Sequence, residues 1–176
     1  MNKRIPKSQI SEIYKDTDLI SLKLSTTEED IYIHNLYIEP PKSYSIKVTP
    51  SILYSLKGLL ELEGGHIILR DFNLHHPLWN SPTYNKHHYI ADELLDIVSE
   101  IRAILYTPKG LATRDCQRGI HHEKIIIDLL FSNVEIEAIP RVNKDLEHGS
   151  DHLPIETTLR IRGLVSSHSL KPSKRL

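Results

Sequence analysis

Short apolar segments typical of β-strands alternate along this chain with two segments typical of α-helices. Residues 18–24 alternate apolar and polar side chains, and residues 31–38 are rich in β-branched and aromatic residues, so both segments favour strands. Residues 52–62 and 89–101 repeat apolar residues every three or four positions, as amphipathic helices do. Further strands are predicted at 66–69, 103–106, 124–131, 134–139 and 153–161. This order of elements predicts a layered α/β fold with mixed β-sheets.

Length and composition exclude several classes of protein. The chain has 176 residues, of which 39% are hydrophobic, so it can form one domain with a buried core. No apolar stretch approaches the roughly 20 residues of a membrane helix, and the first residues lack the apolar segment of a secretory signal. Cys116 is the only cysteine, which excludes an internal disulfide. We therefore expect a protein without a membrane segment, located in the nucleus or the cytoplasm.

Charge is distributed unevenly along the chain. The first 15 residues carry a net charge of +3 and the last 18 carry +5, which leaves −9 for the residues between them. We expect residues 1–17 to form a short basic segment, residues 18–162 the folded domain, and residues 163–176 a flexible basic tail. The acidic centre suits a site that holds a cation, although a solvated surface with two basic ends gives the same balance.

Three short polar segments together contain the residue types that hydrolysis of a phosphate ester requires. Asp71 and Asn73 follow a predicted buried strand, Asp128 lies within another strand, and Asp151 precedes His152. A carboxylate can activate water, a cation can hold phosphate oxygens, and a histidine oriented by an aspartate can stabilise developing charge. Each of these features alone is more often a turn residue or a surface hydrogen bond. Their combination at strand ends favours a catalytic site.

Four motifs carry a family resemblance. The chain contains IHNLYIEPP at 33–41, RDFNLHHPLW at 70–79, IIIDLLF at 125–131 and GSDHLPI at 149–155. In this order they resemble the endonuclease domain of non-LTR retrotransposons, a subgroup of the endonuclease/exonuclease/phosphatase superfamily. The resemblance extends over most of the chain, from residue 18 to residue 161. It implies a four-layer α/β/β/α sandwich and cleavage of DNA phosphodiester bonds with Mg²⁺, for which Mn²⁺ is the alternative ion.

The resemblance also implies roles for single residues. Asp71 resembles the aspartate that activates the attacking water, and Asn73 and Tyr37 resemble the residues beside the scissile phosphate. Asp151 and His152 resemble a pair in which the aspartate orients the histidine and the histidine contacts the phosphate. The remaining implied contacts are Asp128 and Asp151 with the metal, and Asn73, His76, Thr113 and Arg114 with DNA. A plain solvent-exposed loop explains Thr113 and Arg114 equally well.

The chain departs from the family pattern in two places. A glycine of the family, which suits a positive φ or a close backbone approach, is Arg70 here. Arginine there could crowd the site or pair with Asp71, so Arg70→Gly is predicted to raise cleavage. The family's main metal-binding glutamate precedes the strand at 18–24, where this chain offers only Glu12, in no recognisable strand. We therefore expect an incomplete first sheet and an incomplete metal site.

There are two alternatives to an active DNA endonuclease. One is an inactive remnant of a retroelement endonuclease, and the other is a phosphoesterase of the same superfamily that acts on a small phosphate ester. Three histidine pairs, at 75–76, 87–88 and 121–122, also raise the question of zinc. Their spacing lacks the Cys/His pattern of structural zinc sites, so surface loops are the favoured interpretation.

Overall fold

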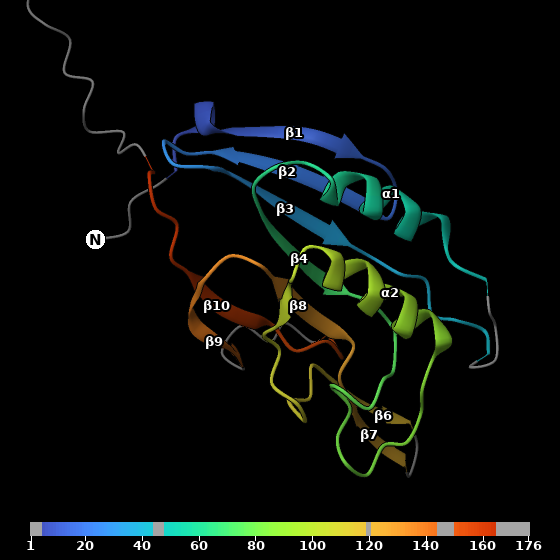
Figure 1. Cartoon of the computed structure of the whole chain (residues 1–176). Helices are drawn as coiled ribbons and strands as arrows, with labels where there is room; N and C mark the ends of the chain where they lie inside the picture. The colour runs from blue at the N-terminus through green and yellow to red at the C-terminus, as the bar shows by residue number, and fades with distance from the viewer. Residues whose placement is uncertain (1–4, 44–47, 119–120, 144–149, 165–176) are drawn as a thin grey trace, which may run out of the picture.

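The computed structural model describes residues 5–43, 48–118, 121–143 and 150–164 (Figure 1). A short 3₁₀ turn at Lys7–Gln9 precedes the first strand. The strands and helices in chain order are β1 (Ile10–Lys15), β2 (Leu19–Ser25), β3 (Asp30–Leu36), α1 (Ser51–Leu60), β4 (Gly65–Asp71), α2 (Tyr89–Glu100), β5 (Ile104–Leu105), β6 (Arg114–Arg118), β7 (His121–Ile125), β8 (Asp128–Ser132), β9 (Ile136–Val142) and β10 (Ile155–Leu159).

Six strands form the central sheet in the order β1-β2-β3-β4-β8-β5. Strands β3 and β4 are parallel, and every other neighbouring pair in this sheet is antiparallel, so the sheet is mixed as predicted. Strands β9 and β10 form a second, two-stranded sheet, and β6 and β7 form a separate hairpin. The α/β class with mixed sheets is confirmed.

Each face of the central sheet is covered by a different layer. Helices α1 and α2 cover one face, where Leu53, Leu56 and Leu94 pack against Ile68 and Phe131 (Figure 1). On the other face, Ile67, Leu130 and their neighbours pack against β9 and β10. The described residues thus form one helical layer and two sheet layers of the predicted sandwich. None of the helices among them has the length and apolar character needed to cross a membrane.

The N-terminal part of the sheet differs from the expectation. Residues 10–15, in the short basic segment where no strand is predicted, form β1 and pair antiparallel with β2. The sequence signal is weak because both faces of this edge strand are exposed, including Ile10 and Ile13. The N-terminal strands therefore belong to the six-stranded central sheet. Among the described residues, β9 and β10 form the sheet of the sandwich that has few strands.

A chain of buried hydrogen bonds crosses β2, β3 and β4. The hydroxyl of Ser21 lies 2.9 Å from Nδ1 of His34, and Nε2 of His34 lies 3.0 Å from Nδ1 of His66. Nε2 of His66 donates to the carbonyl of Leu62 at 2.9 Å. One proton on Nε2 of each ring satisfies the whole chain, so both histidines are accommodated in their neutral form.

Candidate active site

Two aspartates meet where β4 ends and β8 begins. The strands are antiparallel, and their register places Asp71, the last residue of β4, opposite Asp128, the first residue of β8. The side chains keep only 14% and 17% of their exposure, respectively. Sheet pairing alone therefore brings two carboxylates that are 57 residues apart in the sequence to one edge of the fold.

His152 comes from the segment before β10 and lies against both carboxylates. Its Nδ1 is 3.2 Å from Oδ2 of Asp128, and its Nε2 is 3.8 Å from Oδ2 of Asp71. The imidazole keeps about one third of its exposure, so solvent reaches it. We refer to Asp71, Asp128 and His152 as the Asp–His–Asp cluster.

The electrostatics of this cluster favour a bound cation. Burial raises the pKa of the Asp71 carboxyl, and the nearby charge of Asp128 raises it further. Burial also raises the pKa of the Asp128 carboxyl, although His152 acts in the opposite direction. Two carboxylates that are partly removed from water repel each other, and a positive charge between them relieves that repulsion. Carboxylate oxygens are also the ligands that a hard divalent cation prefers.

The turn after β4 fixes the direction of Asp71. Oδ1 of Asp71 accepts the backbone N–H of Asn73 at 3.1 Å, and Nδ2 of Asn73 donates to the carbonyl of Ile38 at 3.0 Å. Asn73 has a φ of 49°, which asparagine tolerates better than most residues. The side chain of Asn73 is buried, and its amide joins this turn to the segment that follows β3.

Arg70 occupies a backbone conformation that favours glycine. Its φ is 109°, a value that costs free energy for any residue with a Cβ atom. The arginine side chain is exposed and lines the same hollow as Asp128 and His152. No ion pair joins Arg70 to Asp71 among the described contacts of these two residues. The departure from glycine therefore stores strain directly before Asp71.

The carboxylate of Asp151 pairs with Arg114 and not with His152, its predicted partner. Its carboxylate accepts Nε of Arg114 at 2.6 Å, and this hydrogen bond lowers the pKa of Asp151. Asp128 is the aspartate that lies beside Nδ1 of His152, whereas the prediction gave the pairing with His152 to Asp151. The physical reason is β6: its residue Asp115 donates a backbone hydrogen bond to the carbonyl of Asp151 and so holds that segment beside Arg114.

Thr113 is buried and does not face solvent, in contrast to the predicted contact with DNA. Its hydroxyl oxygen accepts the backbone N–H groups of Ile127 and Asp128, each at 3.0 Å. Its carbonyl accepts the N–H of Leu153 at 2.7 Å. Thr113 therefore ties the start of β8 to the segment that carries His152.

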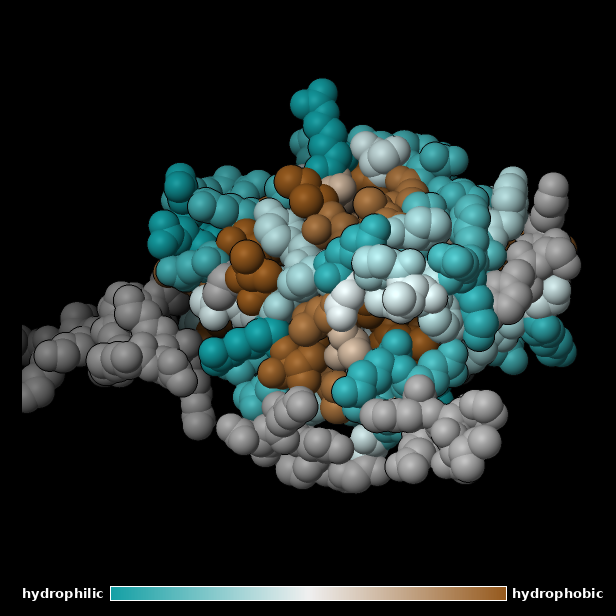
Figure 2. All heavy atoms as spheres, turned by 90° about the horizontal axis from the view of Figure 1, so that it is seen from below, coloured by the Kyte–Doolittle hydropathy of each residue, from teal (hydrophilic) through white to brown (hydrophobic). Residues whose placement is uncertain are grey.

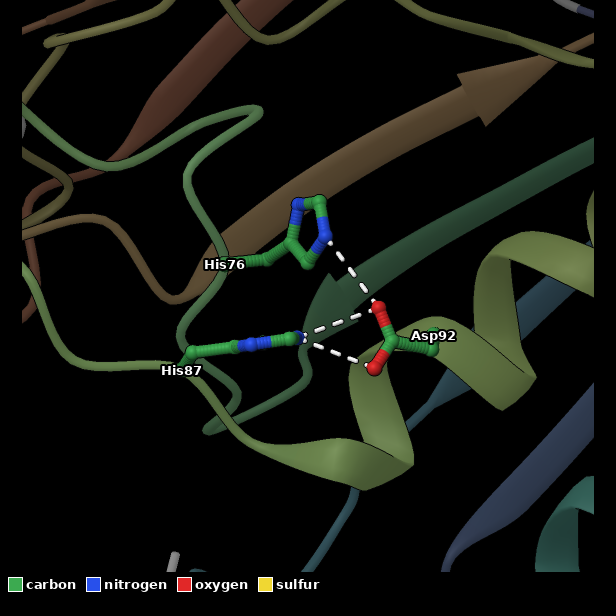
Figure 3. A group of neighbouring side chains, drawn as sticks. All are labelled: His76, His87 and Asp92. Carbon is green, nitrogen blue, oxygen red and sulfur yellow. Dashed lines mark hydrogen bonds and ion pairs between the residues drawn. The ribbon is translucent and has the colours of Figure 1, made fainter.

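Three other predicted positions form no hydrogen bond or ion pair with the cluster among the described contacts. Tyr37 is half-buried and lines a separate hollow of about 300 Å³ together with Glu39 and Lys42. His76 lies beside Asp92 and His87 (Figure 3). Glu12 is exposed on β1, and two strands separate β1 from β4. Glu12 is therefore too far across the sheet to complete the site around Asp71.

Sequence reasoning missed the hollow beside the Asp–His–Asp cluster. It measures about 700 Å³ and is lined by Arg70, Asp128 and His152 on its polar side and by apolar residues that include Leu129 and Leu153. Figure 2 shows hydrophobic atoms gathered in the middle of the face that is seen from below. The only signal in the sequence is the placing of leucine directly after Asp128 and directly after His152.

Comparisons with known proteins identify the family and the fold. A family model described as Endonuclease-reverse transcriptase matches residues 31–156. A search of the curated proteins gave no match. Among solved structures, the endonuclease domain of TRAS1, a telomere-specific non-LTR retrotransposon, matches with a TM-score of 0.69 and 20% identity. That match covers 87% of this chain and 69% of the TRAS1 domain.

Two further structures share the fold. One is an endonuclease/exonuclease/phosphatase family protein from Leptotrichia buccalis, with a TM-score of 0.55 and 15% identity over 90% of this chain and 63% of that one. The other is the 3′ phosphatase NExo from Neisseria bound to a product DNA hairpin, with a TM-score of 0.60 and 14% identity over 90% of this chain and 73% of that one. The chain thus spans about two thirds of the length of these structures. With the match over residues 31–156, it belongs to the endonuclease-reverse transcriptase family, within a superfamily of hydrolases that includes nucleases and phosphatases.

Proposed function

We propose that this chain is a retrotransposon-type endonuclease domain that hydrolyses phosphodiester bonds of DNA with the help of Mg²⁺. The observation that carries this proposal is the Asp–His–Asp cluster, in which one imidazole lies between two half-buried carboxylates at the paired ends of β4 and β8. Its family, the likeness to the TRAS1 endonuclease domain and the DNA-bound NExo structure support the same substrate class.

The donor set fits a divalent metal ion. Enzymes of this superfamily generally depend on divalent metals, and Asp71 and Asp128 are the carboxylates that would hold one here. Asp151, proposed as a ligand from the sequence, is engaged by Arg114 and is the weaker candidate. When bound, such an ion neutralises charge on the phosphate oxygens.

Side chains of the chain itself carry out the remaining steps of hydrolysis. Oδ2 of Asp71 takes the proton of the attacking water. Asp128 holds the imidazole of His152 by Nδ1 and stabilises its protonated form. Nε2 of His152 then donates a hydrogen bond to a phosphate oxygen. Asn73 keeps Asp71 in place through its backbone N–H.

A nicking assay tests this proposal. Supercoiled plasmid is incubated with the purified chain and Mg²⁺, beside the His152→Ala variant and a reaction with EDTA. Nicking that is lost in both controls supports the endonuclease. Equal background in all three reactions contradicts it and supports the inactive remnant, which the strained Arg70 and the distant Glu12 favour. Hydrolysis of a small phosphate ester without nicking would assign the phosphoesterase instead.

A further inference from the structure

A second group of metal-binding side chains lies outside the Asp–His–Asp cluster. His76 comes from the loop after β4, His87 from the segment before α2, and Asp92 from the first turn of α2 (Figure 3). Nε2 of His76 is 3.3 Å from Oδ1 of Asp92, and Nε2 of His87 is 3.0 Å from Oδ2 of the same carboxylate. Figure 3 shows both rings pointing at the two oxygens of Asp92.

The spacing of these atoms matches one small ion. The three ligand atoms lie within 4.8 Å of one another. Ligands held tetrahedrally at about 2.0–2.1 Å from zinc are about 3.3 Å apart, so small side-chain rotations suffice to close the group. We propose that His76, His87 and Asp92 bind one Zn²⁺ ion, with solvent as the fourth ligand.

The chemistry of the donors selects the class of metal. Two imidazoles and one carboxylate suit Zn²⁺ and its borderline neighbours, whereas Mg²⁺ prefers an all-oxygen octahedral set. The side chains keep 19%, 44% and 41% of their exposure, so an ion can enter from solvent and keep a water ligand. None of the three residues belongs to the Asp–His–Asp cluster, and the two sites can therefore be occupied independently.

The surroundings of His76 orient its ring toward the site. The ring packs 5.1 Å from the buried ring of Trp79 and 4.9 Å from the ring of His87, at 78° to the latter. Nδ1 of His76 accepts the N–H of Leu78 at 3.0 Å, so the metal-free form carries its proton on Nε2, next to Asp92. Metal binding at Nε2 moves that proton to Nδ1. The hydrogen bond to Leu78 is exposed, so water can replace Nδ1 as the acceptor.

An ion at this position would join the two ends of one long segment. His76 follows Asn73 by three residues, and His87 lies two residues before Tyr89, the first residue of α2. The bound ion would therefore fix the loop after β4 to the helix that covers the sheet. Its expected role is to order this loop, because the ligands come from segments with no strand pairing between them.

Cobalt spectroscopy tests the site directly. The purified chain is stripped with EDTA, dialysed, and titrated with Co²⁺ in excess Mg²⁺, which competes for the carboxylates of the Asp–His–Asp cluster. We expect the visible absorption of four-coordinate Co²⁺ to saturate at one ion per chain and to disappear when Zn²⁺ is added. Zn²⁺ should also raise the melting temperature of the unaltered chain.

Variants separate this site from others. His87→Asn and Asp92→Asn should each weaken Co²⁺ binding by roughly tenfold or more and remove the Zn²⁺-dependent rise in melting temperature. Asp96→Asn, an exposed carboxylate one turn further along α2, and His152→Ala should both keep the absorption. Circular dichroism checks that every variant is folded. Binding that does not saturate, or that persists unchanged in folded His87→Asn and Asp92→Asn, would overturn the proposal and leave two histidines that only hydrogen-bond to Asp92.

Discussion

His34 and His66 lie on the same sheet as the Asp–His–Asp cluster, but in opposite surroundings. These two histidines are buried between neighbouring strands, and their ring nitrogens are all engaged in a closed chain from Ser21 to the carbonyl of Leu62. His152 is one-third exposed and faces two carboxylates at strand ends. The comparison shows that the surroundings of a histidine decide its role. Histidines buried between paired strands complete the internal hydrogen bonding, whereas the partly exposed His152 lies among charged groups that solvent can reach.

The largest expected effect on nicking tests which aspartate stabilises the protonated form of His152. Asp128→Asn should lower plasmid nicking by about 10²-fold or more, because Nδ1 of His152 loses the carboxylate that stabilises its protonated form. Asp151→Asn should keep the rate within about tenfold, because Asp151 forms its ion pair with Arg114. The rates are compared at equal concentrations of folded protein. A larger loss in Asp151→Asn than in Asp128→Asn would reverse the assignment.

Acid should destabilise the chain through the buried histidines. Burial lowers the pKa of His34 to about 4 and also lowers that of His66, whereas the unfolded chain takes up these protons near pH 6.5. The stability is therefore fully present above pH 6.5 and falls as the pH drops. For His34 alone the loss is about 1.4 kcal/mol per pH unit and about 3 kcal/mol by pH 4.

Urea unfolding at several pH values measures this loss. The His34→Gln variant keeps a donor and an acceptor at this position but has no ionisable group, so its stability should depend less steeply on pH between 6.5 and 4. The difference between the two slopes isolates His34 from the carboxylates Asp71 and Asp128, whose raised pKa values act in the opposite direction. Equal slopes in the two proteins would show that His34 does not titrate in this way.

Thr113 offers a test of how the Asp–His–Asp cluster is held. Thr113→Val leaves two buried N–H groups, those of Ile127 and Asp128, without their acceptor, which should cost about 2 kcal/mol of unfolding free energy and also slow nicking. Thr113→Ser restores the hydroxyl and should recover most of both. If DNA affinity falls in Thr113→Val while stability stays unchanged, then Thr113 contacts DNA after all.

The smallest effect is expected at Arg70. Arg70→Gly removes the side chain from a φ of 109° and should raise the unfolding free energy by about 1 kcal/mol and increase nicking. Arg102→Gly is a matched control, because Arg102 also has a positive φ, 56°, but lies just after α2. It should raise stability without changing nicking. Faster nicking in both variants would assign the gain to stability alone.

The sequence predicted the composition of the cluster better than its pairing. The motifs predict that Asp71, Asp128 and His152 belong to one site, and the structure places the three side chains together. The pairing of Asp151 with Arg114 depends on β6, where no strand is predicted because the polar residues show no apolar alternation. One predicted strand at 124–131 is likewise divided between β7 and β8, which belong to different sheets.

The group of His76, His87 and Asp92 shows a different limit. The histidine pairs were visible in the sequence, but a spacing of eleven residues between His76 and His87 matches no local ligand pattern. Hydrogen bonds between the two segments bring the rings together: the backbone N–H of His88 donates to the carbonyl of His75, and the backbone N–H of His75 donates to Nδ1 of His88. Contacts of this kind depend on tertiary hydrogen bonds that single-sequence periodicity does not encode.

The pairing of β4 with β8 has a consequence for how the chain is made. Asp71 leaves the ribosome 61 residues before Ser132, the last residue of β8. At a synthesis rate of about 5–20 residues per second, roughly 3–12 s pass between the two events. During that interval β4 can pair with β3 but has no partner on its other side. The newly made chain therefore exposes an open strand until translation reaches β8, and a chaperone that binds extended apolar segments would meet it at β4.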